Sequence, residues 1–121
     1  MLSKEEAFKR LENSPFRSRF HLTKKDLDYI EKNGMEKIRS HAMDFVNSRI
    51  RIYDETKDGK QTPMSSHPVF KAQHATAFCC RGCMEKWYGI PKTQTLTDDQ
   101  VERIANFLMA WIEKEKKEKE Q

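Results

Sequence analysis

The residues most able to do chemistry lie in one short stretch of the chain, residues 67–83. This stretch holds all three cysteines and two of the four histidines: His67, His74, Cys79, Cys80 and Cys83. Thiolate and imidazole are the ligands that zinc prefers in proteins, and two cysteines separated by two residues form a common half-site. Cys80 and Cys83 have that spacing, and Gly82 between them permits a tight turn. The segment therefore predicts a zinc knuckle, with zinc as the cofactor.

Helix geometry limits which of these side chains can bind the same ion. If residues 67–75 form one helix, His67 and His74 lie two turns apart, about 10 Å along its axis. The ligand atoms around a tetrahedral zinc lie within about 4 Å of one another, so only one of the two histidines is expected to bind. His74 is closer to the cysteines and is the preferred candidate. The fourth ligand stays open between four residues, although adjacent cysteines seldom bind one ion: Cys79, His67, His41 and His21.

Two other interpretations of the cysteines remain open. Free cysteines are often small buried apolar residues, in which case His74 would be a hydrogen-bonded core histidine. Alternatively, Cys80 or Cys83 could be a redox or nucleophilic thiol. The chain lacks the βαβ pattern that accompanies a thioredoxin-like motif, and no orienting partner or oxyanion hole can be identified for a cysteine hydrolase.

The elements that must position this segment are helices. Thr23 and Thr97 are typical N-cap residues, and a further capping box is expected where Ser3 precedes Glu6. Apolar residues at helical spacing predict the helices, with one short helix ending near Tyr88. The other helices are expected over about residues 3–13, 23–34, 35–50, 67–75 and 97–112. The fold class is therefore a small all-α domain of about five helices.

Two regions depart from this helical pattern. Residues 54–66 are polar and contain Gly and Pro, which predicts one long loop of about 13 residues. Just before it, residues 49–53 alternate and are read either as an extended segment or as the end of the preceding helix. After Ile112 the chain is almost entirely charged. We therefore expect one domain over 1–112 and a fraying helical tail over 113–121.

Composition bounds the class of protein. The chain has 121 residues, of which 36% are hydrophobic and 35% charged, so it can bury one modest core but not two. No apolar run approaches the ~18 residues of a membrane span, no signal-peptide pattern is present, and three cysteines do not make a disulfide framework. We expect a cytoplasmic protein with reduced thiols and no membrane contact. Its oligomeric state stays open.

The net charge of +4 comes from residues 1–53, which hold 12 basic and 8 acidic side chains. Basic residues there are interleaved with Phe16 and Phe20, a mixture that can hold a phosphate backbone and stack bases. The candidate nucleic-acid-binding residues, including two near the cysteines, are Arg17, Arg19, Lys24, Lys25, Arg81 and Lys86. The alternative is that the phenylalanines are core anchors and the basic residues are only solvated. No helix-turn-helix, zinc-finger or RNA-recognition signature is complete.

One block of the sequence is similar to a known family. The residues that carry the likeness are Gly59–Met64, His67–Phe70, Ala72–Ala77, Cys79–Cys83 and Glu85–Trp87, with Arg17–Phe20 and Ile90-Pro91 on either side. Together they resemble a family of small bacterial and phage-borne proteins known only as a domain of unknown function. The resemblance implies no activity. It does imply that residues 59–87 are a family signature and not a chance cluster of cysteines.

The leading hypothesis is a small non-enzymatic binding module, stabilised by zinc, that contacts nucleic acid or a nucleic-acid-associated protein. A second hypothesis is a phage- or bacterium-encoded protein-interaction factor that does not bind nucleic acid. A third is an enzyme, either a metal-dependent hydrolase or a thiol redox protein, whose thiols would need a lowered pKa and access to solvent.

Overall fold

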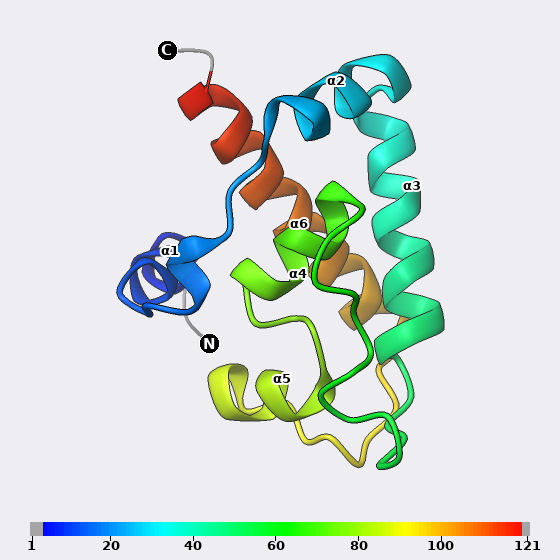
Figure 1. Cartoon of the computed structure of the whole chain (residues 1–121). Coiled ribbons are helices and arrows are strands. Elements are labelled where there is room, and N and C mark those ends of the chain that lie inside the picture. Colours follow the sequence, from blue (N-terminus) through cyan, green and yellow to red (C-terminus); the bar gives the residue numbers. More distant parts are fainter. Residues whose placement is uncertain (1–3, 120–121) are drawn as a thin grey trace.

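The computed structural model describes residues 4–119, and within that range it contains six α-helices and no β-strand (Figure 1). The all-α prediction is confirmed. The α-helices are α1 (Lys4–Glu12), α2 (Lys24–Asn33), α3 (Met35–Phe45), α4 (Pro68–Ala75), α5 (Arg81–Tyr88) and α6 (Asp98–Lys119). A short 3₁₀ turn, η1 (Arg17–Arg19), follows α1, and a π-helical turn, η2 (Val46–Ile50), extends α3.

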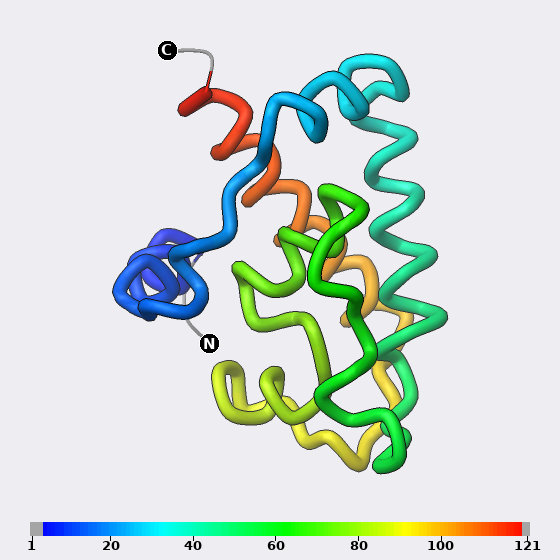
Figure 2. Tube along the Cα trace, in the orientation of Figure 1, coloured from blue at the N-terminus to red at the C-terminus, as the bar shows by residue number. Residues whose placement is uncertain are grey.

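The core lies where α6 crosses α3 and α4. In Figure 2 the long α6 runs diagonally through the molecule, with α3 along one side and α4 against it. Each helix turns one apolar stripe inward, as an amphipathic pattern requires. Fully buried members of this core include Ile38, Ala42, Val69, Ala105, Leu108 and Ile112. The helix α1 and the turn η1 lie to one side of α4, and α5 lies across the end of the molecule (Figure 1).

The N-caps that the sequence predicts at Thr23 and Thr97 are both present. Thr23 forms a reciprocal capping box with Asp26 at the start of α2. The hydroxyl of Thr97 accepts from the Gln100 N–H at 3.1 Å, and the Gln100 side chain accepts from the Thr97 N–H at 2.9 Å. The capping box expected at Ser3 lies outside the described residues.

The first two residues of the segment 49–53 are the end of a helix, and residues 51–53 follow it without forming a strand. The α3 helix continues into the π-helical turn η2, whose Val46 and Ile50 are fully buried. A π turn widens a helix by one residue and shifts the register of its carbonyls. Here the widened end supplies the carbonyls of Ile50 and Arg51 to the guanidinium of Arg81, at 3.4 and 3.0 Å.

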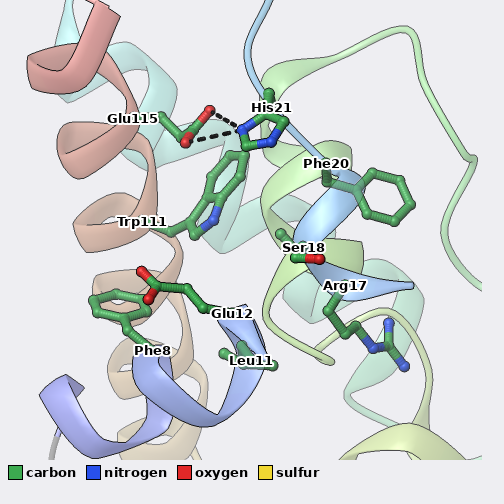
Figure 3. A pocket seen from close by; sticks show the side chains of 10 residues that line it. Phe8, Leu11, Glu12, Arg17, Ser18, Phe20, His21, Trp111 and Glu115 are labelled. Atoms are coloured by element: carbon green, nitrogen blue, oxygen red, sulfur yellow. Dashed lines mark hydrogen bonds and ion pairs between the residues drawn. The ribbon is translucent and has the colours of Figure 1, made fainter. Parts of the chain in front are cut away.

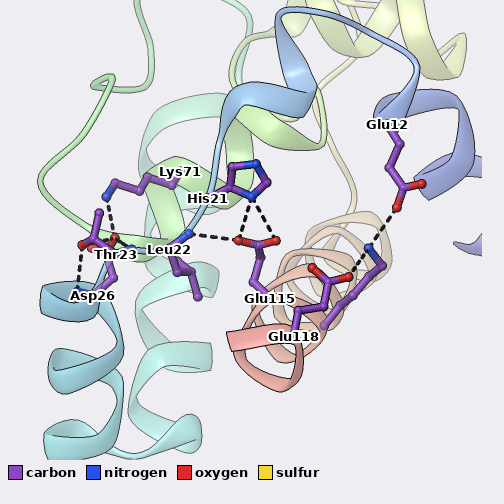
Figure 4. Close-up of polar contacts among 9 residues, drawn as sticks. Glu12, His21, Leu22, Thr23, Asp26, Lys71, Glu115 and Glu118 are labelled. Carbon is purple, nitrogen blue, oxygen red and sulfur yellow. Dashed lines mark hydrogen bonds and ion pairs between the residues drawn. The ribbon is translucent and has the colours of Figure 1, made fainter. Parts of the chain in front are cut away.

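The charged C-terminal region continues α6 as far as Lys119, so the helix expected beyond Ile112 is present over residues 113–119. Within it, the side chain of Glu115 is buried although it lies among charged neighbours. Its carboxylate accepts from the Leu22 N–H at 3.0 Å and from His21 Nδ1 at 3.2 Å (Figure 4). The segment between η1 and α2 is thereby fixed to the last helix.

The polar loop expected over 54–66 is present, and its second half packs into the molecule. Gln61 and Thr62 are buried, and the Thr62 hydroxyl donates to the Cys79 carbonyl at 2.7 Å. Asp58 accepts from the Gly82 N–H at 3.1 Å and so covers the N-terminus of α5. Within residues 4–119, none of the helices combines the length and the apolar character needed to cross a lipid bilayer.

Candidate metal centre

The three cysteines converge on one point. Their sulfur atoms all lie within 4.8 Å of one another, and the chain around them explains why. After α4 ends, Ala77 adopts a left-handed conformation (φ 65°), which reverses the chain toward Cys79. Cys80 is the N-cap of α5 and Cys83 lies in the first turn of that helix, where the Cys80 sulfur accepts from the Cys83 N–H at 3.4 Å. The two-residue spacing therefore places both sulfurs at a helix N-terminus, which favours negative charge.

The cluster is mostly enclosed. Cys79 and Cys80 are buried, with 6% of each residue exposed, whereas Cys83 is only partly buried. All three are free thiols and no disulfide joins them. A reagent or an ion would therefore reach the cluster from the side of Cys83.

A buried arginine that lies far from the cysteines in the sequence contacts them in the structure. Arg17, on η1, donates from Nη1 to the Cys79 sulfur at 3.3 Å and from Nη2 to the Cys83 sulfur at 3.1 Å. Its Nη1 also donates to the His74 carbonyl at 2.7 Å, which fixes the side chain in place. The forked guanidinium thus brings a permanent positive charge into direct contact with two sulfurs.

These contacts shift the pKa values of the thiols in opposite directions. Hydrogen bonds from the thiols of Cys79 and Cys80 lower the pKa of Cys83, and the contact with Arg17 lowers it further. The pKa of Cys79 is raised by its own hydrogen bonds with Cys80 and Cys83, and burial raises it further. The cluster therefore holds negative charge most readily on Cys83, beside Arg17.

His74, which the sequence favours as a ligand, does not belong to the cluster. Its Nε2 lies 3.1 Å from the carbonyl oxygens of both Thr62 and Pro63, so this nitrogen carries a proton and donates to the loop. The imidazole ring also stacks on Phe20, with the ring centroids 5.4 Å apart. His74 matches the alternative interpretation of a hydrogen-bonded core histidine.

The other three histidines lie away from the sulfurs and have partners of their own. His67 caps α4, because its Nδ1 accepts from the Val69 N–H at 3.0 Å. Its Nε2 lies 3.0 Å from Nδ1 of His41, so these two histidines form a pair. His21 contacts Glu115. Of the candidate ligands, the structure brings together the three cysteines, including the adjacent Cys79 and Cys80, and no histidine.

The six candidate nucleic-acid-binding residues fall into two groups. Arg81 is fully buried and donates to four backbone carbonyls, and Arg17 is 7% exposed and faces sulfur, so neither is available to a nucleic acid. Their charge misled the sequence prediction, because an arginine with enough acceptors can be buried. The four exposed residues of the set are Arg19, Lys24, Lys25 and Lys86. Arg19 lies over the exposed ring of Phe16, 5.1 Å from its centroid.

A cavity of about 290 Å³ lies on the other side of Arg17 (Figure 3). Its wall includes Phe8, Glu12, His21 and Trp111, contributed by α1, α6 and the segment between η1 and α2. Figure 3 shows the Arg17 side chain turned away from Phe8 and Trp111, consistent with its contacts to the thiols. The cavity is thus separate from the cysteine cluster and shares only Arg17 with it.

The role of Arg17 had no local signal in the sequence, because its sulfur partners lie 62 and 66 residues further along the chain. The convergence of the cysteines did have such a signal, since all three lie within five residues. Three sulfurs at this separation are a suitable set of ligands for a soft metal ion.

A family model described as a domain of unknown function, DUF4186, matches residues 5–113, which is nearly the whole chain. The match includes the cysteine cluster, Arg17, His74 and the loop whose carbonyls accept from His74. No solved structure matches this chain.

Proposed function

The chain belongs to the DUF4186 family, a domain of unknown function, and so we propose its function from the chemistry of the cysteine cluster. We propose that the protein is a metal-binding module that holds one thiophilic ion, zinc, through Cys79, Cys80 and Cys83. The ion would tie the turn after α4 to the N-terminus of α5.

The convergence of three sulfurs within 4.8 Å carries this proposal. Zinc–sulfur bonds of about 2.3 Å place the sulfurs of one ion about 3.8–4.0 Å apart, so little movement is needed to load the site. Charge supports the same conclusion. Three thiolates and one divalent ion leave one negative charge, and Arg17 in contact with two of the sulfurs balances it.

Metal content tests the proposal directly. The untagged protein is purified and its zinc per chain is measured by elemental analysis, beside Cys80→Ser, Cys83→Ser and His74→Asn. We expect about one zinc per chain in the wild type and in His74→Asn, and almost none in either cysteine variant. Reconstitution of the metal-free protein with Co²⁺ provides a second measurement, because thiolate ligands give cobalt an intense charge-transfer band.

Two outcomes would overturn it. Absence of tight zinc or cobalt binding by the reduced wild-type protein would exclude a metal module and turn attention to thiol redox chemistry at Cys83. Loss of metal in His74→Asn, with the helical content retained, would return the histidine to the ligand set.

A second candidate function is contact with nucleic acid or a nucleic-acid-associated protein. The observation that favours it is the arrangement of Arg19 over the exposed Phe16, a pair suited to a phosphate and a stacked base. Lys24, Lys25 and Lys86 are also exposed. With reduced thiols, we place the protein in the cytoplasm, where such a partner is found.

Binding of the protein to single- and double-stranded oligonucleotides over a series of salt concentrations tests this second candidate. We expect affinity that falls as salt rises and that weakens in Arg19→Gln. Binding weaker than about 10⁻⁴ M at low salt would rule it out, because ordinary non-specific association is stronger than that. A pull-down after nuclease treatment would then examine the protein-interaction alternative.

A further inference from the structure

The cysteine cluster offers three donors and no fourth from the rest of the described chain. Over residues 4–119, the only grouping of three or more potential ligands is that of Cys79, Cys80 and Cys83. His74 is the nearest histidine in sequence, and its Nε2 is already engaged by two carbonyls. A zinc-like ion takes four ligands, and a site with three protein ligands keeps one position for an external donor.

Arg17 contacts two of the three sulfurs, yet a guanidinium cannot coordinate a metal. It has no acceptor atom and stays protonated at any physiological pH. Its contacts with the Cys79 and Cys83 sulfurs place it along one edge of the sulfur triangle. An external donor that approaches this edge would therefore meet a positive charge.

The guanidinium of Arg17 has more N–H groups than it has acceptors among the described residues. A guanidinium carries five N–H groups. Three of them are used, two on Nη1 for the His74 carbonyl and Cys79 and one on Nη2 for Cys83. The Nε–H and the second Nη2–H have no acceptor among the residues that the structure describes. These two donors lie on adjacent nitrogens, the arrangement that binds an anion in a fork.

Access to this position comes from Cys83. It is the least buried of the three cysteines, whereas the Asp58 carboxylate covers the side of the neighbouring Gly82. The exposed Phe16 and Arg19 lie on the same segment as Arg17. A small ligand can therefore reach the edge of the cluster, whereas Cys79 and Cys80 are enclosed.

We propose that the metal-loaded cluster keeps one exchangeable coordination position beside Arg17, and that this position takes a small anionic donor, with a thiolate as the preferred class. Thiolate is favoured because soft donors match an ion already held by sulfur. The proposal rests on the metal-binding function above. It adds that the site has an external ligand and that Arg17 is the residue that positions it.

The experiment uses the full-length protein reconstituted with Co²⁺, whose visible spectrum reports coordination number and ligand type. The cobalt protein is titrated with 2-mercaptoethanol and, separately, with azide. We expect saturable changes in the ligand-field bands with both anions. The thiol should also intensify the thiolate-to-cobalt charge-transfer band, because a fourth sulfur is added.

Variants assign the role of Arg17. Arg17→Gln should retain cobalt but bind both anions about tenfold or more weakly, because a hydrogen bond to a charged group is lost. Arg17→Lys keeps the charge without the fork and should fall between the two. Arg10→Gln is the matched control: it removes one nearby positive charge, and Arg10 contacts Trp87 and not sulfur, so its anion affinity should equal that of the wild type.

The outcomes separate this inference from the function on which it rests. If the wild type does not bind cobalt, the metal-binding proposal itself fails. If cobalt binds with a charge-transfer band but neither anion alters the spectrum, only the exchangeable position is refuted. If Arg17→Gln binds anions as tightly as the wild type, the position exists and Arg17 does not serve it. Should Arg17→Gln lose its helical content, Arg17→Lys supplies the same comparison.

Discussion

Arg81 connects two separate parts of the chain through one side chain. Its Nη1 donates to the carbonyls at the end of η2, and its Nη2 donates to the carbonyls of Pro91 and Gln94 at 2.9 and 2.7 Å. The residue is fully buried, and burial lowers the pKa of its guanidinium, an effect that Asp58 and Glu85 oppose. Because four carbonyls depend on it, Arg81 is a structural residue despite its charge.

We predict that Arg81→Met lowers the free energy of unfolding by at least about 3 kcal/mol, because each buried carbonyl left without a donor costs about 1–3 kcal/mol. Urea unfolding followed by circular dichroism measures the change. Arg39→Met is the control, since Arg39 is partly exposed and its nearest carboxylate is 3.7 Å away. Equal stability of the two variants would contradict a structural role for Arg81.

His67, which contacts His41, is expected to make stability depend on pH. Burial lowers the pKa of His67 to about 4, and the neighbouring His41 lowers it too, whereas Asp26 opposes the shift. Neutral His67 uses Nδ1 to cap α4, so a proton on that atom would remove the cap. A histidine with a lowered pKa in the folded state contributes its full stability above the unfolded pKa, near 6.5, and loses it as the pH falls toward 4.

We therefore expect the free energy of unfolding to fall by about 1 kcal/mol between pH 6.5 and pH 5, a value reduced to allow for the partial exposure of His67. His67→Asn should remove this part of the pH dependence while it keeps a capping oxygen for the Val69 N–H. Unfolding curves at several pH values test this. If the free energy of unfolding of His67→Asn changes with pH as steeply as that of the wild type, His67 is not the source of the dependence.

At the scale of elements, α6 is the helix on which the others depend. It packs against α3 and α4 along its apolar stripe, and its last turns hold the segment between η1 and α2 through Glu115. The buried carboxylate satisfies the Leu22 N–H, a backbone group that would otherwise be buried without a partner. An apparently featureless run of charges therefore contains one residue with a tertiary role.

We predict that Glu115→Ala destabilises the protein by about 1.5–3 kcal/mol, the range for a lost hydrogen bond to a charged group. Glu113→Ala is the matched control on the same helix, because Glu113 is exposed and pairs with Lys117 at the surface. Its effect should stay below about 0.5 kcal/mol. Chemical unfolding measures both variants, and equal unfolding midpoints would contradict the tertiary role of Glu115.

For the whole molecule, the contact between η1 and the cysteine cluster joins segments that are 62 to 66 residues apart in the chain. Two of the sulfurs proposed to bind the ion also accept from Arg17, so metal binding would bear on this long-range contact. Any ligand that binds only the folded state raises its stability in proportion to the logarithm of its concentration.

We expect zinc at 100 times its dissociation constant to raise the free energy of unfolding by about 2.7 kcal/mol. Cys83→Ser should show no such gain, and magnesium, which prefers oxygen ligands, should have no effect on either protein. Thermal unfolding of metal-free and loaded samples measures both. A gain of the same size in Cys83→Ser would place the zinc elsewhere.

Local features were readable from the sequence and distant ones were not. Thr23 and Thr97 were identifiable as caps because their partners are three residues away, and the cysteines because they are close neighbours in the chain. The partners of His74 in the structure, the carbonyls of Thr62 and Pro63, have no signal in the sequence, because they belong to a loop whose path carries no pattern. The burial of Arg81, a candidate nucleic-acid-binding residue, has no signal in the sequence either, because charge alone does not reveal burial.

The contacts of Arg81 also bear on how this family can vary. Surface turns ordinarily gain and lose residues freely during evolution. The turn that contains Pro91 and Gln94 supplies two of the carbonyls that hold a buried charge, so an insertion there would withdraw an acceptor from the interior. Among relatives, this turn should therefore keep a constant length wherever the arginine is kept, and the two should be lost together.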